Sequence, residues 1–378
     1  MKGMVATRIS QRLHEIEAAG QLRQLYLPAG IDLSSNDYLG LAHHPLLKKR
    51  MAEAIWRDGC GSTGSRLLRG QRDCFSRIER RFAKFKGTEA ALYFGSGYAA
   101  NLAVLSSFLE SGDHAFSDSL NHASLIDGMR LGKAIKTVFP HGDTQALAHA
   151  LDSSRADLRF VVTESVFSVD GDFAPLRNYA SPIRESGAAL IVDEAHAVGI
   201  YGEHGSGLVE ALGISDAVFL SVNPMGKAFG VSGAFVCGPA QAIEYLIQRA
   251  RPFVFSTAPP PAVAAALDAA LDLIEDQPER RARVLTLARF LRGLLAGMGF
   301  AVSCEGSHII PIVIGDNQTA VAAAATLQRA GFDVRAIRPP TVPQGTARLR
   351  VSVNAGLDEA TLHRFACELA AALGKPAA

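Results

Sequence analysis

The chain has 378 residues, of which 48% are hydrophobic, and its 38 basic and 37 acidic side chains leave a formal net charge of +1. This length is sufficient for a large domain and a smaller second one, and the balanced charge gives no basis for binding nucleic acid or an anionic membrane surface. The five cysteines include no C-x-x-C pair, which argues against a disulfide framework and a structural zinc site and fits a reducing compartment. With no secretory signal and no apolar stretch of the ~18 residues that a membrane span needs, the sequence predicts a cytoplasmic protein without a metal.

The order of predicted elements indicates an α/β fold. A helical pattern covers the first residues, and between positions 42 and 260 helical patterns alternate with short apolar runs: AALYF, KTVF, LRFVVTE, AALIVDE, AVFLSV and GAFVCG. Most of these runs are typical of strands buried on both faces, and alternation with helices predicts a mostly parallel sheet. After Pro261 one long helical stretch leads to short strands around 307–315 and 347–355. We expect an N-terminal arm (1–45), a large domain (46–262) and a small C-terminal α+β domain (263–378).

Two of the apolar runs end at residues that suit pyridoxal phosphate (PLP). AALIVDEAHAVG stops at Asp193, and 34 positions later FLSVNPMGKAFG stops at Lys227, flanked by Gly226 and Gly230. PLP needs an amine that holds it as a Schiff base and a carboxylate that keeps its pyridine nitrogen protonated. Asp193, Lys227 and Glu164 each follow a predicted strand, and ligands gather at the carboxyl ends of strands in such sheets.

Further candidates lie at other turns of the predicted sheet. In YFGSGYAANLAVL a strand ends near Ser96 and Gly97 and a helix begins, so that free N–H groups and a hydroxyl form a candidate phosphate site. In NHASLIDG, the imidazole of His122 is placed to stack on an aromatic cofactor. His196, three residues after Asp193, is placed to donate a hydrogen bond to the phenolic oxygen of PLP. The same glycine and serine pattern also occurs at ordinary strand-to-helix turns, and histidines at such positions often have a purely structural role.

Two other motifs do not have the context that they need. Gly59, Gly61 and Gly64 spell G-x-G-x-x-G but follow a helical pattern, whereas the dinucleotide-binding motif follows a strand. Residues 193–196 spell the D-E-A-H of helicases, yet the chain has no G-x-x-x-x-G-K-[ST] loop. The common zinc-protease and serine-hydrolase motifs are also missing from the sequence.

A series of motifs, in order along about 31–356, resembles the α-oxoamine synthases. They are LSSNDYLGLAHHP, GSTGSRLLRGQ, FGSGYAANLAVL, LNHASLIDG, VVTESVFSVDGD, LIVDEAHAVGIYGEHGSG, MGKAFGVSGAFVCG and RPFVFSTAPPPAV. This family consists of fold-type I PLP-dependent transferases, which condense an amino acid with an acyl thioester and release carbon dioxide. SSNDYLGL and AIRPPTVPQGTARLR are most similar to the branch that joins L-alanine to a pimeloyl thioester in biotin synthesis.

The resemblance implies a role for each matching residue. Lys227 is the Schiff-base lysine and the base for the alanine α-proton, and the remaining cofactor contacts come from Asp193, His122, His196, Ser168, Ser96, Gly97 and Tyr98. Ser256 or Thr257 reaches the phosphate from a partner subunit, which implies a homodimer with shared active sites. Arg350 holds the amino acid carboxylate, with Asn36 nearby.

The resemblance leaves several alternatives open. HAVGIYGEHG is similar to the 5-aminolevulinate synthase branch, so a sister synthase that joins glycine or serine to another acyl thioester is the alternative. The acyl carrier is coenzyme A or acyl carrier protein. A non-catalytic subunit is a third possibility, although the presence of Lys227, Asp193 and His122 argues against it. Three residues before the lysine, where the family usually has a threonine, this chain has Pro224, so Asn223 or Ser221 replaces that phosphate contact or Ser96 and the partner subunit carry more of it.

Overall fold

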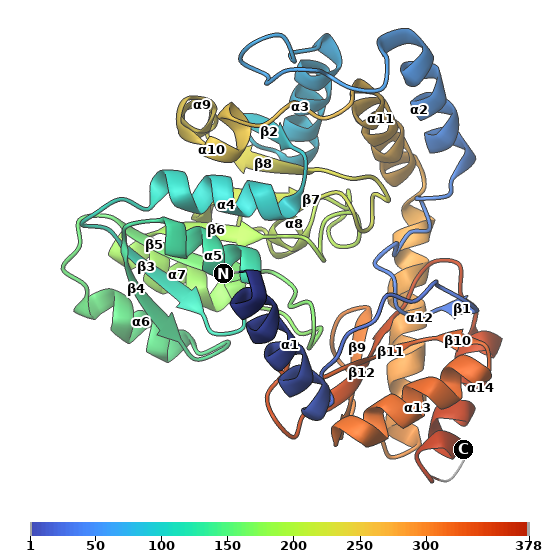
Figure 1. The fold of residues 1–378 in the computed structure, drawn as a ribbon. Coiled ribbons are helices and arrows are strands. Elements are labelled where there is room, and N and C mark those ends of the chain that lie inside the picture. The colour runs from blue at the N-terminus through green and yellow to red at the C-terminus, as the bar shows by residue number, and fades with distance from the viewer. Residues whose placement is uncertain (1, 376–378) are drawn as a thin grey trace. The chain divides into compact units, whose positions relative to one another are not determined.

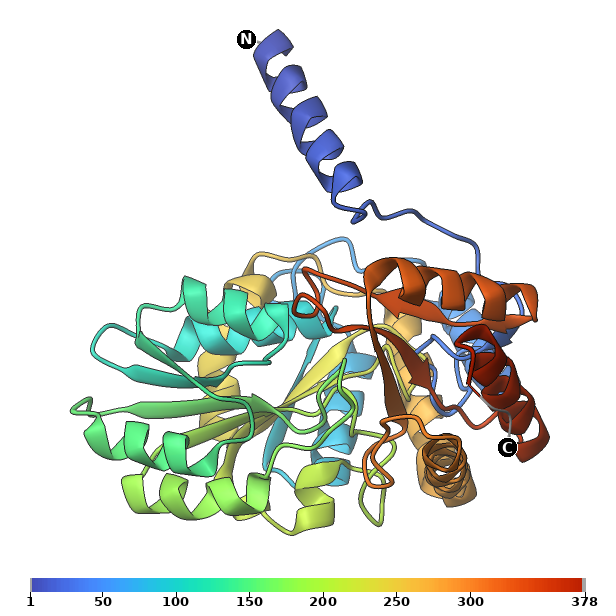
Figure 2. The same ribbon diagram turned by 90° about the horizontal axis from the view of Figure 1, so that it is seen from below.

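The computed structural model describes residues 2–375, which form two compact units. The large unit comprises Asn36–Ser168 and Asp172–Leu285, and the small unit comprises the residues up to Ser35, Val169–Gly171 and the residues from Thr286 onward. Figures 1 and 2 show the elements of each unit. Among the described residues, no helix is both long enough and apolar enough to cross a membrane.

The large unit is built on a seven-stranded sheet with the strand order β2-β8-β7-β6-β5-β3-β4. The strands are β2 (Ala90–Phe94), β3 (His114–Asp118), β4 (Ile135–Phe139), β5 (Arg159–Glu164), β6 (Ala189–Asp193), β7 (Val218–Pro224) and β8 (Ala234–Gly238). The strands from β7 to β4 pair in parallel, whereas β8 is antiparallel to both of its neighbours. The predicted mostly parallel sheet is therefore confirmed.

Helices cover both faces of this sheet (Figures 1 and 2). One face is covered by α4 (Gly97–Phe108), α5 (Ala123–Leu131), α9 (Ala240–Arg249) and α10 (Arg251–Val254), whose apolar residues form one buried cluster with those of the strands. The other helical elements of this unit are α2 (Pro45–Asp58), α3 (Asp73–Lys86), α6 (Thr144–Ser153), α7 (Leu176–Ser186), α8 (Leu208–Leu212), the short 3-10 helix η1 (Ser215–Ala217) and α11 (Pro261–Asp276). On the face opposite α4, Phe82 of α3 stacks on Phe235 of β8, with ring centroids 4.1 Å apart.

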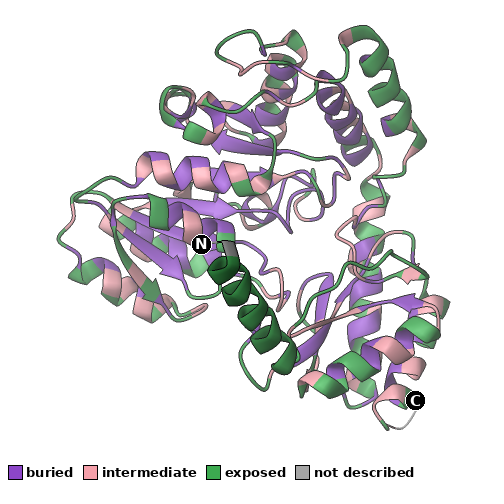
Figure 3. Ribbon diagram, viewed as in Figure 1, coloured by how far each residue is buried: buried purple, intermediate pink, exposed green. Residues whose placement is uncertain are grey.

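The small unit contains a three-stranded antiparallel sheet with the order β11-β12-β9. Its strands are β9 (Ile309–Gly315), β11 (Arg335–Ile337) and β12 (Ala347–Ser352), and a separate parallel pair joins β1 (Ile31–Asp32) to β10 (Phe332–Asp333). Its helices are α1 (Lys2–Ala18), α13 (Asn317–Arg329) and α14 (Glu359–Ala372), together with the end of α12 (Pro278–Gly297), which begins in the large unit. Leucine, isoleucine and phenylalanine side chains from α12, β9, β12 and α14 form its core, whereas the described residues of α1 are exposed (Figure 3).

Three details differ from the pattern expected from sequence. The single helical stretch predicted after Pro261 is two helices, α11 and α12, because α11 ends at Asp276 and Pro278 begins the next helix. The strand β3 was not predicted, since its sequence HAFSD carries polar residues that are nevertheless buried. The edge strand β4 is mostly exposed, unlike the other runs.

Candidate functional site

The predicted site residues of the large unit lie at one edge of its sheet. Glu164 is the last residue of β5 and pairs in register with Asp193, the last residue of β6. The neighbouring strand β7 ends at Pro224, and Lys227 follows three residues later. Because these strands run in parallel, their carboxyl ends meet at the same edge. The predicted positions at strand ends are confirmed, and the chemical roles stay predictions.

Lys227 is in hydrogen-bond contact with one of the predicted histidines. Its Nζ lies 3.0 Å from Nε2 of His196, and Nδ1 of His196 lies 2.6 Å from the hydroxyl of Tyr38. The Tyr38 hydroxyl donates to Oδ1 of Asn36 at 2.9 Å. The sequence interpretation named Lys227, His196 and Asn36 but missed Tyr38, although it lies in the same SSNDYLGL motif as Asn36. The amine is therefore held by a chain of polar side chains.

The carboxylate of Asp193 is buried and accepts two hydrogen bonds. Its Oδ1 accepts from the backbone N–H of Ala195 at 2.8 Å, and its Oδ2 accepts from Nδ2 of Asn101 on α4 at 2.7 Å. Asp193 is thus oriented by its own loop and by the helix that covers the sheet. Asn101 lies within the FGSGYAANLAVL motif, but sequence reasoning did not identify it as a site residue.

His122 is the N-cap residue of α5, directly after the loop that follows β3. Its backbone N–H donates to Oε1 of Glu164 at 2.7 Å, and its Nδ1 lies 2.7 Å from Oγ of Ser124. Partial desolvation of the ring is the main reason that the pKa of His122 lies below its ordinary value; the charge of Asp193 opposes this shift and that of Lys227 adds to it. The imidazole is therefore neutral near pH 7.

Glu164 is a second acidic group at this edge of the sheet. Burial, together with the nearby charge of Asp193, raises the pKa of Glu164 to about 8. Burial thus favours the protonated form of Glu164. The sequence interpretation placed this residue at a strand end but assigned it no role.

The predicted phosphate site lies where α4 begins. Ser96 is the N-cap residue, and its side chain accepts from the N–H of Ala99 at 3.2 Å. The first N–H groups of a helix have no intrahelical partner and attract anions. Tyr98 follows in the first turn, where its hydroxyl donates to Asp127 and its ring lies edge-on to His122 with centroids 6.4 Å apart. Among the predicted residues, Ser96 and Tyr98 are exposed.

Pro224 packs directly against this helix start. A Cβ added to Gly97 would lie 2.6 Å from Cγ of Pro224, so only glycine fits at position 97. Asn223 and Ser221 point to the opposite face of β7, where Nδ2 of Asn223 donates to Oγ of Ser221 at 3.1 Å and to the carbonyl of Phe235 at 3.3 Å. Strand alternation turns both side chains away from α4, which disfavours the alternative that one of them replaces the missing threonine. The other alternative, that Ser96 and the partner subunit carry more of the phosphate contact, stays a prediction.

The remaining predicted residues occupy several places. Ser168 is half-buried in the loop after β5, and Ser256 and Thr257 are exposed between α10 and α11. In the small unit, Arg350 lies on β12, where its Nη1 donates to Oγ of Ser352 at 2.8 Å. Burial and the positive charges of Arg350 and Arg292 lower the pKa of the buried His308 to about 3, so that imidazole is neutral.

The residues at the sheet edge fit PLP. They provide an amine, a carboxylate with fixed orientation, an imidazole on a helix start, and a serine N-cap with the first N–H groups of α4. These are the groups that the aldehyde, pyridine nitrogen, ring and phosphate of this cofactor require. Histidine, aspartate and lysine in this arrangement are also able to hold and transfer protons.

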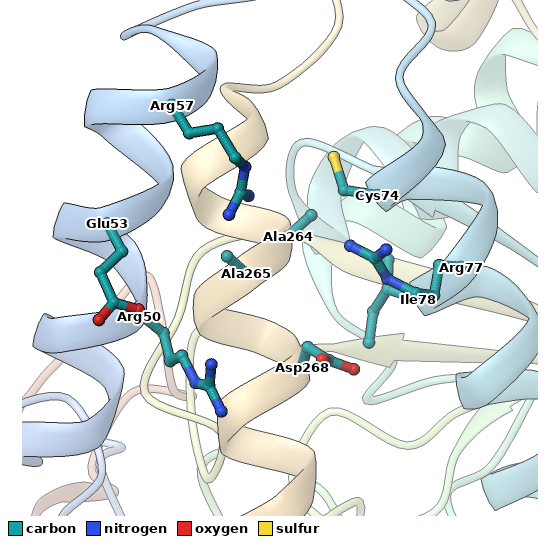
Figure 4. A pocket seen from close by; sticks show the side chains of 9 residues that line it. All are labelled: Arg50, Glu53, Arg57, Cys74, Arg77, Ile78, Ala264, Ala265 and Asp268. Atoms are coloured by element: carbon teal, nitrogen blue, oxygen red, sulfur yellow. The ribbon is translucent and has the colours of Figure 1, made fainter.

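A separate pocket in the large unit contains none of these residues. It has a volume of about 150 Å³ and lies between α2, α3 and α11. Figure 4 shows Arg50, Glu53 and Arg57 on α2 at one side of this pocket, Cys74 and Arg77 on α3 at the other, and Asp268 on α11. Acidic and basic groups alternate around it, as on an ordinary charged surface.

Comparison with known proteins agrees with the chemistry of the sheet edge. Residues 28–369 match the family "Aminotransferase class I and II". The chain belongs to this family. Within the family it is similar to 8-amino-7-oxononanoate synthases, with 48% identity to that of Anaeromyxobacter dehalogenans (strain 2CP-1 / ATCC BAA-258), covering 94% of this chain and 89% of the relative. Identity to the Geobacter sulfurreducens enzyme of the same name is 43%, covering 96% and 97%.

The chain has the same fold as several solved structures. The serine palmitoyltransferase of Sphingomonas wittichii has a TM-score of 0.90 at 31% identity, covering 97% of this chain and 96% of the other. The 8-amino-7-oxononanoate synthase of Francisella tularensis has a TM-score of 0.80 at 30% identity, covering 91% and 98%. These findings confirm the predicted resemblance to α-oxoamine synthases and the fold-type I architecture.

Proposed function

We propose that this chain is a PLP-dependent acyltransferase that condenses L-alanine with a pimeloyl thioester to give 8-amino-7-oxononanoate, carbon dioxide and the free thiol carrier. A bond forms between the alanine α-carbon and the acyl carbon, the thiol leaves, and the alanine carboxylate is lost as carbon dioxide. The observation that carries the proposal is the identity of 48% and 43% to two 8-amino-7-oxononanoate synthases over nearly the whole chain. The sheet-edge residues supply the chemistry that this reaction needs.

PLP would be held by groups that the structure brings to one edge of the sheet. Lys227 would bind its aldehyde carbon, Asp193 its pyridine nitrogen and His122 one face of its ring. The phosphate would lie at the start of α4, near Ser96, Gly97 and Tyr98. His196 and Ser168 are our candidates for the phenolic oxygen. The domain that we propose for PLP binding is 46–262.

The reaction requires removal of a proton from the alanine α-carbon. When bound, PLP supplies an electron sink for the electron pair that remains at this carbon. Nζ of Lys227 is the base in this proposal, and its contact with Nε2 of His196 at 3.0 Å gives the proton a second acceptor. Arg350 would bind the alanine carboxylate through its planar guanidinium, with Asn36 as a second contact.

We further propose that the enzyme is a homodimer with shared active sites. Ser256 and Thr257 are exposed between α10 and α11 and would each be available to a partner's phosphate site. Phe255 beside them is 72% exposed and would be available to the same partner. The cytoplasm is the proposed location, and the acyl donor is a pimeloyl group on coenzyme A or on acyl carrier protein.

Product mass spectrometry tests the proposed function. Protein loaded with PLP would be given pimeloyl-CoA with L-alanine, glycine and L-serine in competition, and Lys227→Ala protein would serve as the control. A dominant 8-amino-7-oxononanoate product that needs Lys227 is expected. Failure to form any ketone, with coenzyme A or with acyl carrier protein as the carrier, would contradict the proposal.

A second candidate is a sister synthase that uses another amino acid. It is favoured by the TM-score of 0.90 to a serine palmitoyltransferase, although the sequence identity is only 31%. In the same competition experiment a serine- or glycine-derived ketone would support this candidate. The identity of the preferred amino acid is thus read directly from the mass of the product.

A further inference from the structure

Four side chains in the large unit form a continuous hydrogen-bond chain between the two groups proposed to contact the cofactor ring. Oδ2 of Asp193 is 2.7 Å from Nδ2 of Asn101, which is 2.9 Å from Oγ of Ser124. Oγ of Ser124 is 2.7 Å from Nδ1 of His122. Asn101 and Ser124 are buried, with exposed fractions of 2% and 1%. Neither residue belongs to the site predicted from sequence.

The direction of every hydrogen bond in this chain follows from its ends. An ionised carboxylate only accepts, so Asn101 must present its NH2 group, and not its carbonyl oxygen, to Asp193. The second N–H of the same NH2 group then points to Ser124, whose Oγ accepts it. The single O–H of Ser124 is left to donate to Nδ1 of His122. The backbone N–H of Ser124 also donates to this Nδ1, at 3.2 Å.

The O–H and the backbone N–H of Ser124 therefore both donate to Nδ1 of His122. A nitrogen that accepts two hydrogen bonds carries no proton of its own. We infer that Asn101 and Ser124 are positioning residues that fix His122 as the neutral tautomer protonated on Nε2, because the Asp193 carboxylate accepts from Asn101 and so orients its amide. Nε2 has no hydrogen-bond partner among residues 2–375. His122 thus presents an uncharged ring with one N–H donor.

The groups around His122 are compatible with this state. Glu164 on β5 accepts from its backbone N–H, Lys227 after β7 disfavours a positive charge on its ring, and Asp193 on β6 opposes that effect. Tyr98 on α4 contributes only the edge of its ring. A neutral ring can stack on the cofactor without adding a second positive charge beside the protonated pyridine nitrogen, and Nε2–H is left to hydrogen-bond a substrate oxygen. This consequence for catalysis rests on the proposed function, whereas the tautomer does not.

Nitrogen NMR of the imidazole tests the inference independently of activity. Full-length protein with ¹⁵N-labelled histidine, loaded with PLP, would be measured by long-range ¹H–¹⁵N correlation, and the His122→Gln variant would assign the signals. The wild type is expected to show a protonated Nε2 and an unprotonated Nδ1. A protonated Nδ1 would overturn the inference whether or not the protein makes 8-amino-7-oxononanoate.

Substitutions separate positioning from mere packing. Ser124→Ala removes the O–H donor and is expected to lower the ratio of the Nε2-protonated to the Nδ1-protonated tautomer by about tenfold. Ser124→Thr keeps the hydroxyl and should keep the ratio of the wild type. Asn101→Leu removes the N–H that donates to Oγ of Ser124, so the Ser124 hydroxyl is free to rotate and the same ratio should fall. Ser107→Ala is the matched control, because Ser107 is a buried serine on the same helix as Asn101 whose Oγ has no hydrogen-bond partner among the described residues. Equal effects of Ser124→Ala and Ser107→Ala, or no effect of Ser124→Ala, would contradict the inference.

Discussion

Nζ of Lys227 lies 3.0 Å from Nε2 of His196, which itself contacts the hydroxyl of Tyr38 at 2.6 Å. The amine proposed to bind the cofactor is thus in contact with a group that can take or return its proton. Lys227 is near the end of β7 and His196 is in the loop after β6, two neighbouring parallel strands. Pairing of these two strands brings Lys227 and His196 together although they are 31 residues apart in sequence.

Replacing Lys227 by arginine keeps the positive charge but removes the primary amine. We expect the turnover rate to fall by at least about 10³-fold, since both covalent attachment and proton removal are lost. Borohydride reduction followed by peptide mass spectrometry would fix PLP to the peptide that contains Lys227 in the wild type and to no peptide in the variant. Cofactor attached to a different lysine in the wild type would contradict the proposed role.

Pro224 is expected to weaken phosphate binding. Its ring lies against Gly97 at the start of α4, and a proline side chain donates no hydrogen bond. Pro224→Thr should therefore lower the dissociation constant of PLP by about tenfold, which is the effect of one hydrogen bond to a charged group. Fluorescence titration of cofactor-free protein would measure it. Ser221→Ala is the control on the same strand; a larger effect there would show that the opposite face of β7 contributes to the phosphate site.

The sequence predicted those site residues that interrupt an apolar run. Asp193 and Lys227 stand out because each ends a stretch typical of a buried strand, and Glu164 does so for the same reason. Strand β3 was missed because the half-buried His114 and the buried Ser117 and Asp118 hide the apolar pattern.

The supporting groups were not predicted because they act across long sequence distances. Asn101 bonds to a carboxylate 92 residues away, and Lys86 to one 108 residues away. No local pattern marks such pairs, since each is created only when α3 or α4 packs on the sheet. The side-chain direction of Asn223 was also open in the sequence, because it depends on strand register rather than on residue type.

The contacts of His141 predict that the free energy of unfolding depends on pH. It lies between Asp118 at 2.9 Å and Asp172 at 2.6 Å, and hydrogen bonds to these two carboxylates raise the pKa of His141 from 6.5 to about 10. A pKa raised in the folded state means that the stabilisation is fully present below about pH 6.5 and is lost as the pH rises through about 10.

We therefore expect His141→Gln to lower the free energy of unfolding by about 2 kcal/mol near pH 6, a value reduced for the partial exposure of the ring. The difference between variant and wild type should shrink toward about pH 10. Urea unfolding at several pH values would measure it, with the exposed His149→Gln on α6 as the control. A difference that stays constant with pH would show that the charge of His141 is not what stabilises the fold.

Substitution of Arg350 should weaken the binding of the amino acid substrate and leave the binding of the acyl donor unchanged. Its planar guanidinium can bind a carboxylate through two parallel hydrogen bonds, which a lysine ammonium cannot do. We expect Arg350→Lys to raise the KM for L-alanine by about tenfold or more and to leave the KM for pimeloyl-CoA nearly unchanged. Arg335→Lys on the adjacent strand β11 is the control, since Arg335 pairs with Asp333. An equal rise in both KM values would indicate a general disturbance of the small unit.

The buried ion pair between Lys86 and Glu194 supports the loop that carries His196. Nζ of Lys86 lies 2.5 Å from Oε2 of Glu194, both side chains are almost completely buried, and Oε1 of Glu194 also accepts from the N–H of Val209. Lys86→Met would leave the carboxylate buried without its counter-charge, which costs about 3–5 kcal/mol of stability.

We expect the double variant Lys86→Met with Glu194→Gln to recover part of this loss, because the amide keeps an acceptor for Val209 without a charge. Lys84→Met, an exposed position on the same helix, is the control. Urea unfolding of all variants at the same PLP concentration would measure the three values. If the double variant were no more stable than Lys86→Met alone, the loss would come from packing around Lys86, and the unpaired charge of Glu194 would not be its cause.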